Sequence, residues 1–376
     1  MNYYILPKNT FNLQIRANYH NKIEPYISNS LNFFLQKKQN QLTNIELSID
    51  EINNAKQAIN YLSNVYLSFN NYNINISKLS NTNQIYYELL EVISSCGIKD
   101  ILINKQSLTS AFISPNSASI NNLFTSFRNN VVTDINYSCA FEYNLINNIF
   151  FSNNLSNSLD ILFFEFKEYD YCDIRKLSKN LIIMLYFICK LINKCGTVIF
   201  KLDNCFHKIV IDFIYIISSL FDKTIILKPF ISNITDNTKY LICKGFNTNT
   251  INLNKIMYGL EEYVYTYLNN INNGSNIISG VYIDSILDNK IPYYFINKLE
   301  EINIVIGQQQ IDSIEQVICL LKNKNKDEKL EIIKKGNIIK AIQWCEKFNV
   351  PHIKQIEKPN IFLKRGDKEV NETSNV

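Results

Sequence analysis

The feature that most constrains the fold is a series of short apolar segments that alternate with longer apolar helix patterns between residues 159 and 246. The segment 159–166 contains an unbroken Ile-Leu-Phe-Phe run at 161–164, which is typical of a strand buried on both faces of a sheet. Further strands are predicted over 197–202, 224–227 and 239–244, and helices over 177–194 and 207–221. Strands that are separated by helices of this length form parallel sheets, so we expect an α/β domain.

The last two of these strands are joined differently. Only residues 229–238 lie between strands 224–227 and 239–244, which is too short for a crossover helix, so these two strands should pair antiparallel. The order of these elements, strand, helix, strand, helix, strand, loop and strand, predicts a Rossmann-like parallel sheet with one antiparallel edge strand. A strand over 108–113 and a helix over 118–127 extend the same domain upstream.

The regions on either side of this domain, which we place at 96–248, have mainly helical patterns. In the N-terminal region 1–95, helical spacing is found over 45–67 and 84–95, and the second run ends near Gly97. The C-terminal region 249–358 predicts helices over 251–269, 292–302, 311–321 and 337–348, with a charged linker or solvated helix over 322–335. The polar tail 359–376 is expected to be disordered.

Composition and charge exclude several classes of protein. The chain of 376 residues carries 38 basic and 34 acidic side chains, a net charge of +4, with no basic tail or stripe to indicate a polyanion partner. Nine scattered cysteines form no CxxC pair and no ligand spacing, so we expect free thiols in a reducing compartment and no metal site. The chain does not begin with a signal-peptide pattern, and its longest apolar run, 181–192, is too short for a bilayer core of about 30 Å. These features predict a cytoplasmic protein that is neither secreted nor bound to a membrane.

Three motifs carry a resemblance to a known enzyme family. They are Gly196-Thr-Val-Ile-Phe-Lys201, Lys228-Pro-Phe-Ile-Ser232 and Lys239-Tyr-Leu-Ile-Cys-Lys244. Their sequence and order resemble the FtsJ (RrmJ-type) ribose 2′-O-methyltransferases, in particular the versions of large nucleocytoplasmic DNA viruses. Two outlying segments, 24–31 and 340–351, are similar to the same viral group. The resemblance implies S-adenosyl-L-methionine as cofactor, capped RNA as substrate, protein partners in the viral transcription or capping machinery, and a location in the host cytoplasm or the virion.

The family's reaction uses a Lys-Asp-Lys-Glu set around the ribose 2′-hydroxyl. This hydroxyl is a very weak acid, so a lysine kept near neutral by a second cation must orient or deprotonate it. The resemblance places the central lysine at Lys201, and the remaining three positions at Glu165 for the aspartate, Thr238 for the glutamate and Glu88 for the first lysine. Two plainer interpretations stay open: Lys201 as a surface lysine at a strand end, and Glu165 as a strand-end acid rather than a stand-in for aspartate.

The family's cofactor loop, Pro-Gly-Gly-Phe, has its counterpart in Ser114, Pro115, Asn116 and Ser117. Glycines in such a loop let the backbone approach the cofactor, and both are replaced here. The resemblance places these four residues and Glu165 at the cofactor site. A carboxylate near Lys201 favours the protonated amine, and each lost acid or base costs about 10²–10⁴ in rate. The sequence therefore favours a methyltransferase fold that has lost catalysis.

Two functions from different classes follow. One is an S-adenosylmethionine-dependent RNA cap ribose 2′-O-methyltransferase, and the other is a non-catalytic RNA-binding or scaffolding subunit of a viral transcription or capping complex, or of the virion. The loop at Asn116–Ser117 and the residue Thr238 favour the second. A dehydrogenase is disfavoured because the chain has no GxGxxG motif. We interpret His207 as structural, and Trp344 with Phe348 as core packing.

Overall fold

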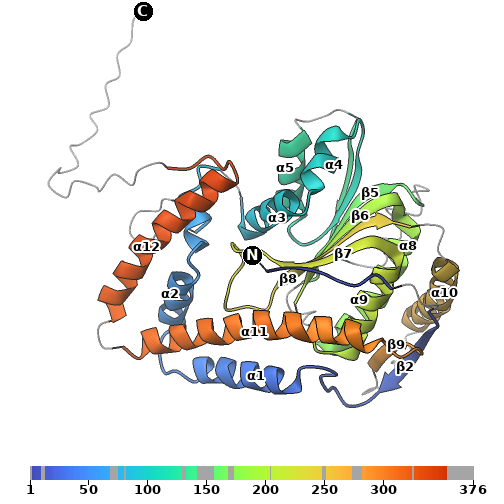
Figure 1. Cartoon of the computed structure of the whole chain (residues 1–376), viewed down its shortest axis with the longest axis horizontal. Helices are drawn as coiled ribbons and strands as arrows, with labels where there is room; N and C mark the ends of the chain where they lie inside the picture. The colour runs from blue at the N-terminus through green and yellow to red at the C-terminus, as the bar shows by residue number, and fades with distance from the viewer. Residues whose placement is uncertain are drawn as a thin grey trace, which may run out of the picture.

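The computed structural model shows a central sheet with helices on both faces (Figure 1). The residues that it describes are 2–9, 13–67, 75–79, 82–128, 133–141, 156–167, 173–203, 205–247, 251–272, 282–323 and 326–353. The predicted disordered tail and Cys172 therefore lie outside the described residues.

Seven described strands form the sheet, in the order β1-β7-β8-β6-β5-β3-β4. Their bounds are β1 (Asn2–Ile5), β3 (Thr109–Ile113), β4 (Ile135–Cys139), β5 (Leu159–Phe164), β6 (Ile192–Leu202), β7 (Phe221–Lys228) and β8 (Lys239–Phe246). Strands β4, β3, β5 and β6 pair parallel, whereas β8 pairs antiparallel with both β6 and β7. The predicted mixed α/β class with a mostly parallel sheet is confirmed.

The sheet has an antiparallel strand at one edge, as predicted, but this strand is β1, and a second antiparallel strand lies inside the sheet. Strand β8 does pair antiparallel with β7, but it lies inside the sheet, between β7 and β6. The edge is taken by β1, which pairs antiparallel with β7. Tyr240, Leu241, Ile242 and Cys243 of β8 are fully buried, as an unbroken apolar run in a central strand should be.

Side chains that alternate along the strands divide the core into two layers. Helices α8 (Ile174–Leu191) and α9 (Lys208–Leu220) cover one face, and α3 (Gln84–Ser95), α4 (Ile98–Asn104) and α5 (Ser117–Arg128) cover the other (Figure 1). In β5, for example, Leu162 and Phe164 face the α8 and α9 layer, whereas Ile161 and Phe163 face the α3 layer. The sheet is therefore buried on both faces.

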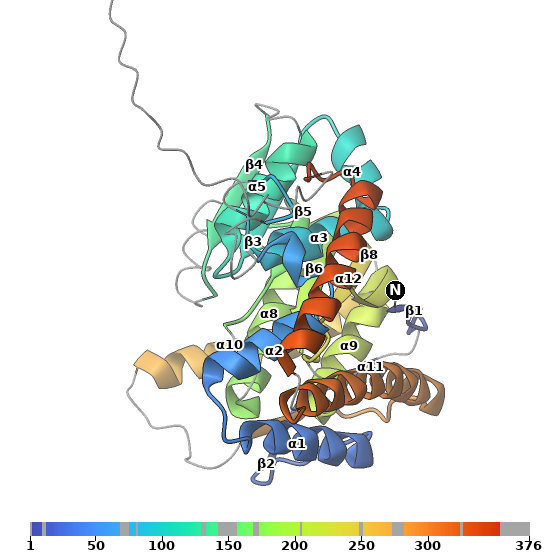
Figure 2. The same ribbon diagram turned by 90° about the vertical axis from the view of Figure 1, so that its left-hand side faces the viewer.

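The helices of the two flanking regions pack on one another. Helix α1 (Asn29–Thr43) runs alongside α11 (Tyr293–Leu321), and α2 (Ile49–Ile59) contacts both α11 and α12 (Lys326–Lys347) (Figures 1 and 2). The two helices approach closely at Gly307, where a Cβ would lie 2.8 Å from the end of the Leu31 side chain. Helices α1, α2, α11 and α12 thus pack together beside the sheet, and we call this unit the helical frame.

Several predicted boundaries in the flanking regions are wrong. The helices expected over 292–302 and 311–321 are one continuous helix, α11. The charged stretch 322–335 is helical from Lys326 onward, which is one of its two predicted forms, but it continues without a break into the helix expected over 337–348 to form α12. The run 45–67 divides into α2, which ends at Ile59, and a short 3-10 helix, Ser63–Val65. Helix α2 begins at Ile49 rather than at residue 45, because Ser48 and Glu51 form a capping box there.

The sequence also missed three short strands. These are β4, β2 (Ile15–His20) and β9 (Tyr282–Leu287), and the last two form a separate antiparallel ribbon. Helix α10 (Ile251–Asn272) packs beside this ribbon and α8. β9 is anchored to α9 by the buried Asp212, whose carboxylate accepts hydrogen bonds from the Ser285 hydroxyl and the backbone N–H groups of Ile286 and Leu287.

Thiols and membrane spans agree with the sequence. Of the eight cysteines in the described part of the chain, all are free and six are buried, with Cys195 and Cys319 exposed. Burial raises the pKa of the Cys139 thiol to about 11 and that of Cys189 to about 12, so these thiols stay protonated. Within the described ranges, the helices are too short or too polar to cross a bilayer.

Candidate functional site

A cleft of about 1250 Å³ lies at the carboxyl ends of β3, β5 and β6. The loops after these strands form one part of its lining, α3 forms another, and α1 and α11 of the helical frame complete it. The carboxyl ends of parallel strands are the usual position of ligand sites in open α/β sheets. The residues predicted from the resemblance that line this cleft are Glu88, Pro115, Asn116, Glu165, Lys201 and Thr238.

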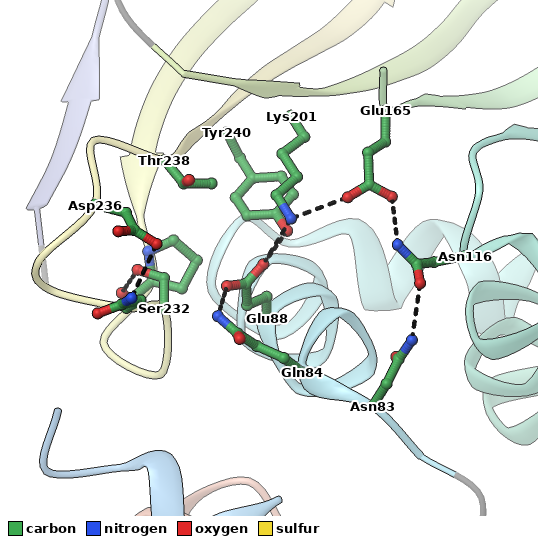
Figure 3. A network of polar contacts seen from close by, with 12 residues as sticks. Asn83, Gln84, Glu88, Asn116, Glu165, Lys201, Ser232, Asp236, Thr238 and Tyr240 are labelled. Atoms are coloured by element: carbon green, nitrogen blue, oxygen red, sulfur yellow. Dashed lines mark hydrogen bonds and ion pairs between the residues drawn. The ribbon is translucent and has the colours of Figure 1, made fainter. Parts of the chain in front are cut away.

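Lys201 lies near the end of β6, and its amine is held between two carboxylates (Figure 3). Its Nζ is 2.9 Å from Oε1 of Glu165 and 3.7 Å from Oε2 of Glu88. Burial acts to lower the pKa of Lys201, but the charges and hydrogen bonds of Glu88 and Glu165 outweigh it, so the pKa is raised above its ordinary value. The predicted effect of Glu165 on the amine thus has the expected direction, and Glu88 adds to it.

Glu88 projects from α3 and is almost fully buried. Its Oε1 accepts a hydrogen bond of 2.8 Å from Gln84 Nε2, one helical turn earlier, and its Oε2 accepts one of 2.5 Å from the Tyr240 hydroxyl. Tyr240 lies directly opposite Lys201 in the β6–β8 pair, so both side chains reach the same face. Tyr240 is a site residue that the sequence analysis missed, and the position of β8 beside β6 was the signal that could have found it.

Glu165 follows β5 and closes the loop that follows β3. Its Oε2 accepts hydrogen bonds of 2.5 Å from Ser114 Oγ and 3.0 Å from Asn116 Nδ2. The Asn116 side chain in turn accepts one of 3.0 Å from Asn83 Nδ2, at the start of α3. The loop's polar side chains are therefore bound to the protein's own carboxylate (Figure 3), and Ser117 begins α5.

Thr238 lies in the loop 229–238, which two buried lysines hold in place. Lys228 Nζ donates to the backbone oxygens of Asn233 (3.1 Å), Asp236 (2.7 Å) and Thr238 (3.0 Å). Burial lowers the pKa of Lys228 to about 8, and the nearby charge of Lys239 acts in the same direction. Lys239 Nζ donates to the backbone oxygens of Asp203 and Asn237, which joins this loop to the one that follows β6.

Glu91, one turn after Glu88, is a buried carboxyl group that sequence reasoning missed, and burial raises its pKa. Its carboxylate accepts hydrogen bonds from the backbone N–H groups of Phe230 (2.8 Å) and Ile231 (3.2 Å) and from Trp344 Nε1 (3.0 Å). The predicted core contact of Trp344 with Phe348 is present, with ring centroids 4.7 Å apart. α12 is therefore tied through Glu91 to the loop that lines the cleft.

His207 also lines the cleft, at the residue before α9. Its Nδ1 lies 3.2 Å from the backbone oxygen of Glu24. Burial lowers the pKa of His207, so the imidazole is neutral at pH 7. Among the described residues, no group of histidine, cysteine and carboxylate side chains is arranged to hold a metal ion.

Comparisons with known proteins add no assignment to this geometry. No protein-family model matches the chain, and no curated protein matches its sequence significantly. The function must therefore be argued from the cleft itself.

Proposed function

We propose that this protein is a non-catalytic relative of the FtsJ-type RNA ribose 2′-O-methyltransferases that serves as a binding or scaffolding subunit, in a transcription or capping assembly as the resemblance implies. The observation that carries the proposal is the Lys201 amine, which lies between Glu88 and Glu165. A base for a ribose hydroxyl has to give up its proton near the operating pH. Two carboxylates around one ammonium act in the opposite direction.

The arrangement of the strands supports the family relationship. Residues that the resemblance assigns to one set, Glu88, Glu165 and Lys201, come from α3, β5 and β6 and lie within ion-pair distance. Glu165 and Glu88 lie 36 and 113 positions before Lys201 in the sequence. Convergence at the carboxyl end of a mostly parallel sheet is what a Rossmann-like methyltransferase domain requires.

The loop that follows β3 does not fit S-adenosylmethionine. Where the family has glycines, Asn116 and Ser117 add side chains, and the polar groups of Ser114 and Asn116 already bind Glu165. Phe166, next to Glu165, is packed between Phe141 and Phe200, with ring centroids 4.7 and 5.4 Å apart. A cofactor in this place would have to break the Glu165 hydrogen bonds or displace these rings.

One observation favours the active enzyme as a second candidate. The cleft is large enough for a nucleotide, and Lys201 is among the residues that line it. An enzyme of this kind would need to move Glu165 away from the loop before binding its cofactor.

Titration of the purified protein with S-adenosylmethionine, followed by thermal unfolding, separates the two candidates. A ligand at 100 times its Kd stabilises a protein by about 2.7 kcal/mol. We expect no shift in Tm at millimolar cofactor, and no methyl transfer to capped RNA above that of Lys201→Ala. A saturable shift together with methylation that Lys201→Ala abolishes would overturn the proposal.

A further inference from the structure

The part of the cleft that α1 and α11 contribute is rich in carboxamides and carries no cation. Nine carboxamides line the whole cleft, and Asn32, Gln36 and Gln39 of α1 and Gln310 of α11 belong to this part of it. A carboxamide offers both a carbonyl acceptor and N–H donors, so it matches the N–H and C=O groups of an extended peptide. Buried apolar side chains also line the cleft, such as Leu35 of α1 and Phe206, which lies between β6 and α9.

The charges of the lining are mostly negative, although the whole chain has a net charge of +4. Five side chains that line the cleft are carboxylates and two are cations. The carboxylates are Glu88, Glu165, Asp173, Asp203 and Asp236, and the cations are Arg175 and Lys201. The Lys201 amine is already engaged by two of the carboxylates. Because His207 is neutral at pH 7, it adds no positive charge. Such a lining repels phosphates, which proteins bind mainly through lysine and arginine.

Two further ammonium groups, Lys228 and Lys239, lie behind this surface and offset part of its negative charge. They do not line the cleft, and both are nearly inaccessible to solvent. Each amine donates hydrogen bonds to the loop carbonyls described above. The surface that a ligand meets near residues 203 and 233–238 therefore presents carboxylates and carboxamides rather than ammonium groups.

Gln310 of α11 supplies an independent indication of a ligand. Its side chain is 2% exposed and lines the cleft, and its Nε2 donates a hydrogen bond of 2.9 Å to the backbone oxygen of Thr235. This bond fixes the orientation of the amide, and Oε1 has no hydrogen-bond partner within the described residues. A buried acceptor without a partner costs about 1–3 kcal/mol, so a ligand that brings an N–H group to this oxygen is favoured.

We infer that the cleft binds an extended segment of a partner protein that carries an arginine or lysine side chain, which docks beside Asp203, Asp236 and Gln310. Three properties select this occupant: the acceptor-rich lining, the carboxamides that match a peptide backbone, and a volume above the roughly 300–1,000 Å³ of ordinary small-molecule sites. The inference rests on the proposed non-catalytic function, because it assigns the cleft to a peptide instead of a cofactor and RNA.

Peptide phage display on the full-length protein tests this inference. Peptides enriched on the wild-type protein are synthesised with a fluorophore, and their binding is measured by fluorescence anisotropy. We expect enriched peptides to contain arginine or lysine, to bind at least about 10-fold more weakly to Asp203→Asn/Asp236→Asn, and to bind unchanged to the control Glu346→Gln. Glu346 is an exposed acid on α12 outside the cleft. Circular dichroism establishes that the double variant is folded, and Gln310→Leu is a second variant with an expected loss of affinity.

Three outcomes would overturn the inference. The first is that no peptide is enriched over an unrelated bait. The second is that the enriched peptides bind the cleft variants as tightly as they bind the wild-type protein. The third is that a labelled 20-nucleotide uridine RNA displaces the peptide and binds the cleft variants more weakly than the wild type. The cofactor titration remains a separate measurement. A positive cofactor titration with negative peptide results would refute both proposals, whereas negative results in both would refute only the peptide.

Discussion

Lys201 and Lys228 stand near the ends of β6 and β7, on either side of β8, yet their charges are stabilised in different ways. Lys201 lies between two buried carboxylates, and its pKa is raised. Lys228 is surrounded by three backbone carbonyls, and burial lowers its pKa to about 8. Full opposite charges outweigh the loss of solvation, whereas carbonyl dipoles do so only in part. The first lysine is thus held in its protonated form, and the second fixes the loop 229–238.

The largest effect is expected from removing the Lys201 charge. Lys201→Ala leaves Glu88 and Glu165 as two buried carboxylates without their cation, which should lower the free energy of unfolding at pH 7 by about 3 kcal/mol. This is the lower end of the range for breaking a buried pair, because 21% of the Lys201 side chain is exposed. Urea denaturation measures the loss, and Lys201→Arg is the control that keeps the charge.

The pH dependence of the same variant sharpens the comparison. Two unpaired carboxylates repel each other in folded Lys201→Ala, and protonation of either one relieves the repulsion. Stability is then recovered as the pH falls, and the deficit should be smaller at pH 5 than at pH 7. An equal deficit at both values would show that the carboxylates do not depend on Lys201.

The second effect concerns the carbonyl cluster. Lys228→Met leaves three buried carbonyls without their donor, and we expect a loss of about 2 kcal/mol at pH 7. The exposed Lys99→Met on α4 is the matched control. Between pH 8 and 10.5 the unfolded wild-type chain binds more protons than the folded one, so its stability rises with pH in that window. The stability difference between wild type and Lys228→Met should therefore grow by about 1.5 kcal/mol from pH 8 to 9.5. A difference that shrinks would refute the lowered pKa.

A smaller effect is expected when the buried carboxyl group of Glu91 loses one of its hydrogen-bond donors. Glu91 accepts three N–H hydrogen bonds, one of them from Trp344. Trp344→Phe keeps an aromatic ring but removes that donor, so we expect a loss of about 1.5 kcal/mol. Glu91→Gln combined with Trp344→Phe should lose less than the sum of the two single variants, and additive losses would indicate that the contact carries no coupling.

The smallest effect is expected at Thr238. Lys228 contacts the backbone oxygen of Thr238 rather than its side chain, so Thr238→Ala should change stability by less than about 0.5 kcal/mol. A larger loss in thermal unfolding would show that the hydroxyl itself supports the cleft.

Much of the α/β domain could be predicted because its signals are local. The buried runs that became β5, β6, β7 and β8 and the apolar helix patterns between them depend on neighbouring residues. The edge strand β1 could not be read in this way, because it reaches its place only through pairing with residues more than 200 positions away. Strands β2 and β9 are held together by similarly distant pairs.

The residues of the candidate site were likewise predicted only in part. The resemblance brought Glu88, Glu165 and Lys201 to one place, although nothing local in the sequence joins them. Tyr240 and Glu91 were missed because their partners, Glu88 and Trp344, lie 152 and 253 positions away. The helical frame could not be foreseen as a wall of the cleft, because α1 and α11 meet across most of the chain.

The central claim is that the Lys201 amine stays charged. Selective ¹³Cε labelling of lysine, with Lys201→Arg to assign the signal, gives its titration midpoint by NMR. The account predicts a midpoint above the ordinary lysine value of 10.5, falling on replacement of Glu165 by Gln. A midpoint near neutral pH in the wild-type protein would contradict this prediction and would indicate that Lys201 can act as a catalytic base.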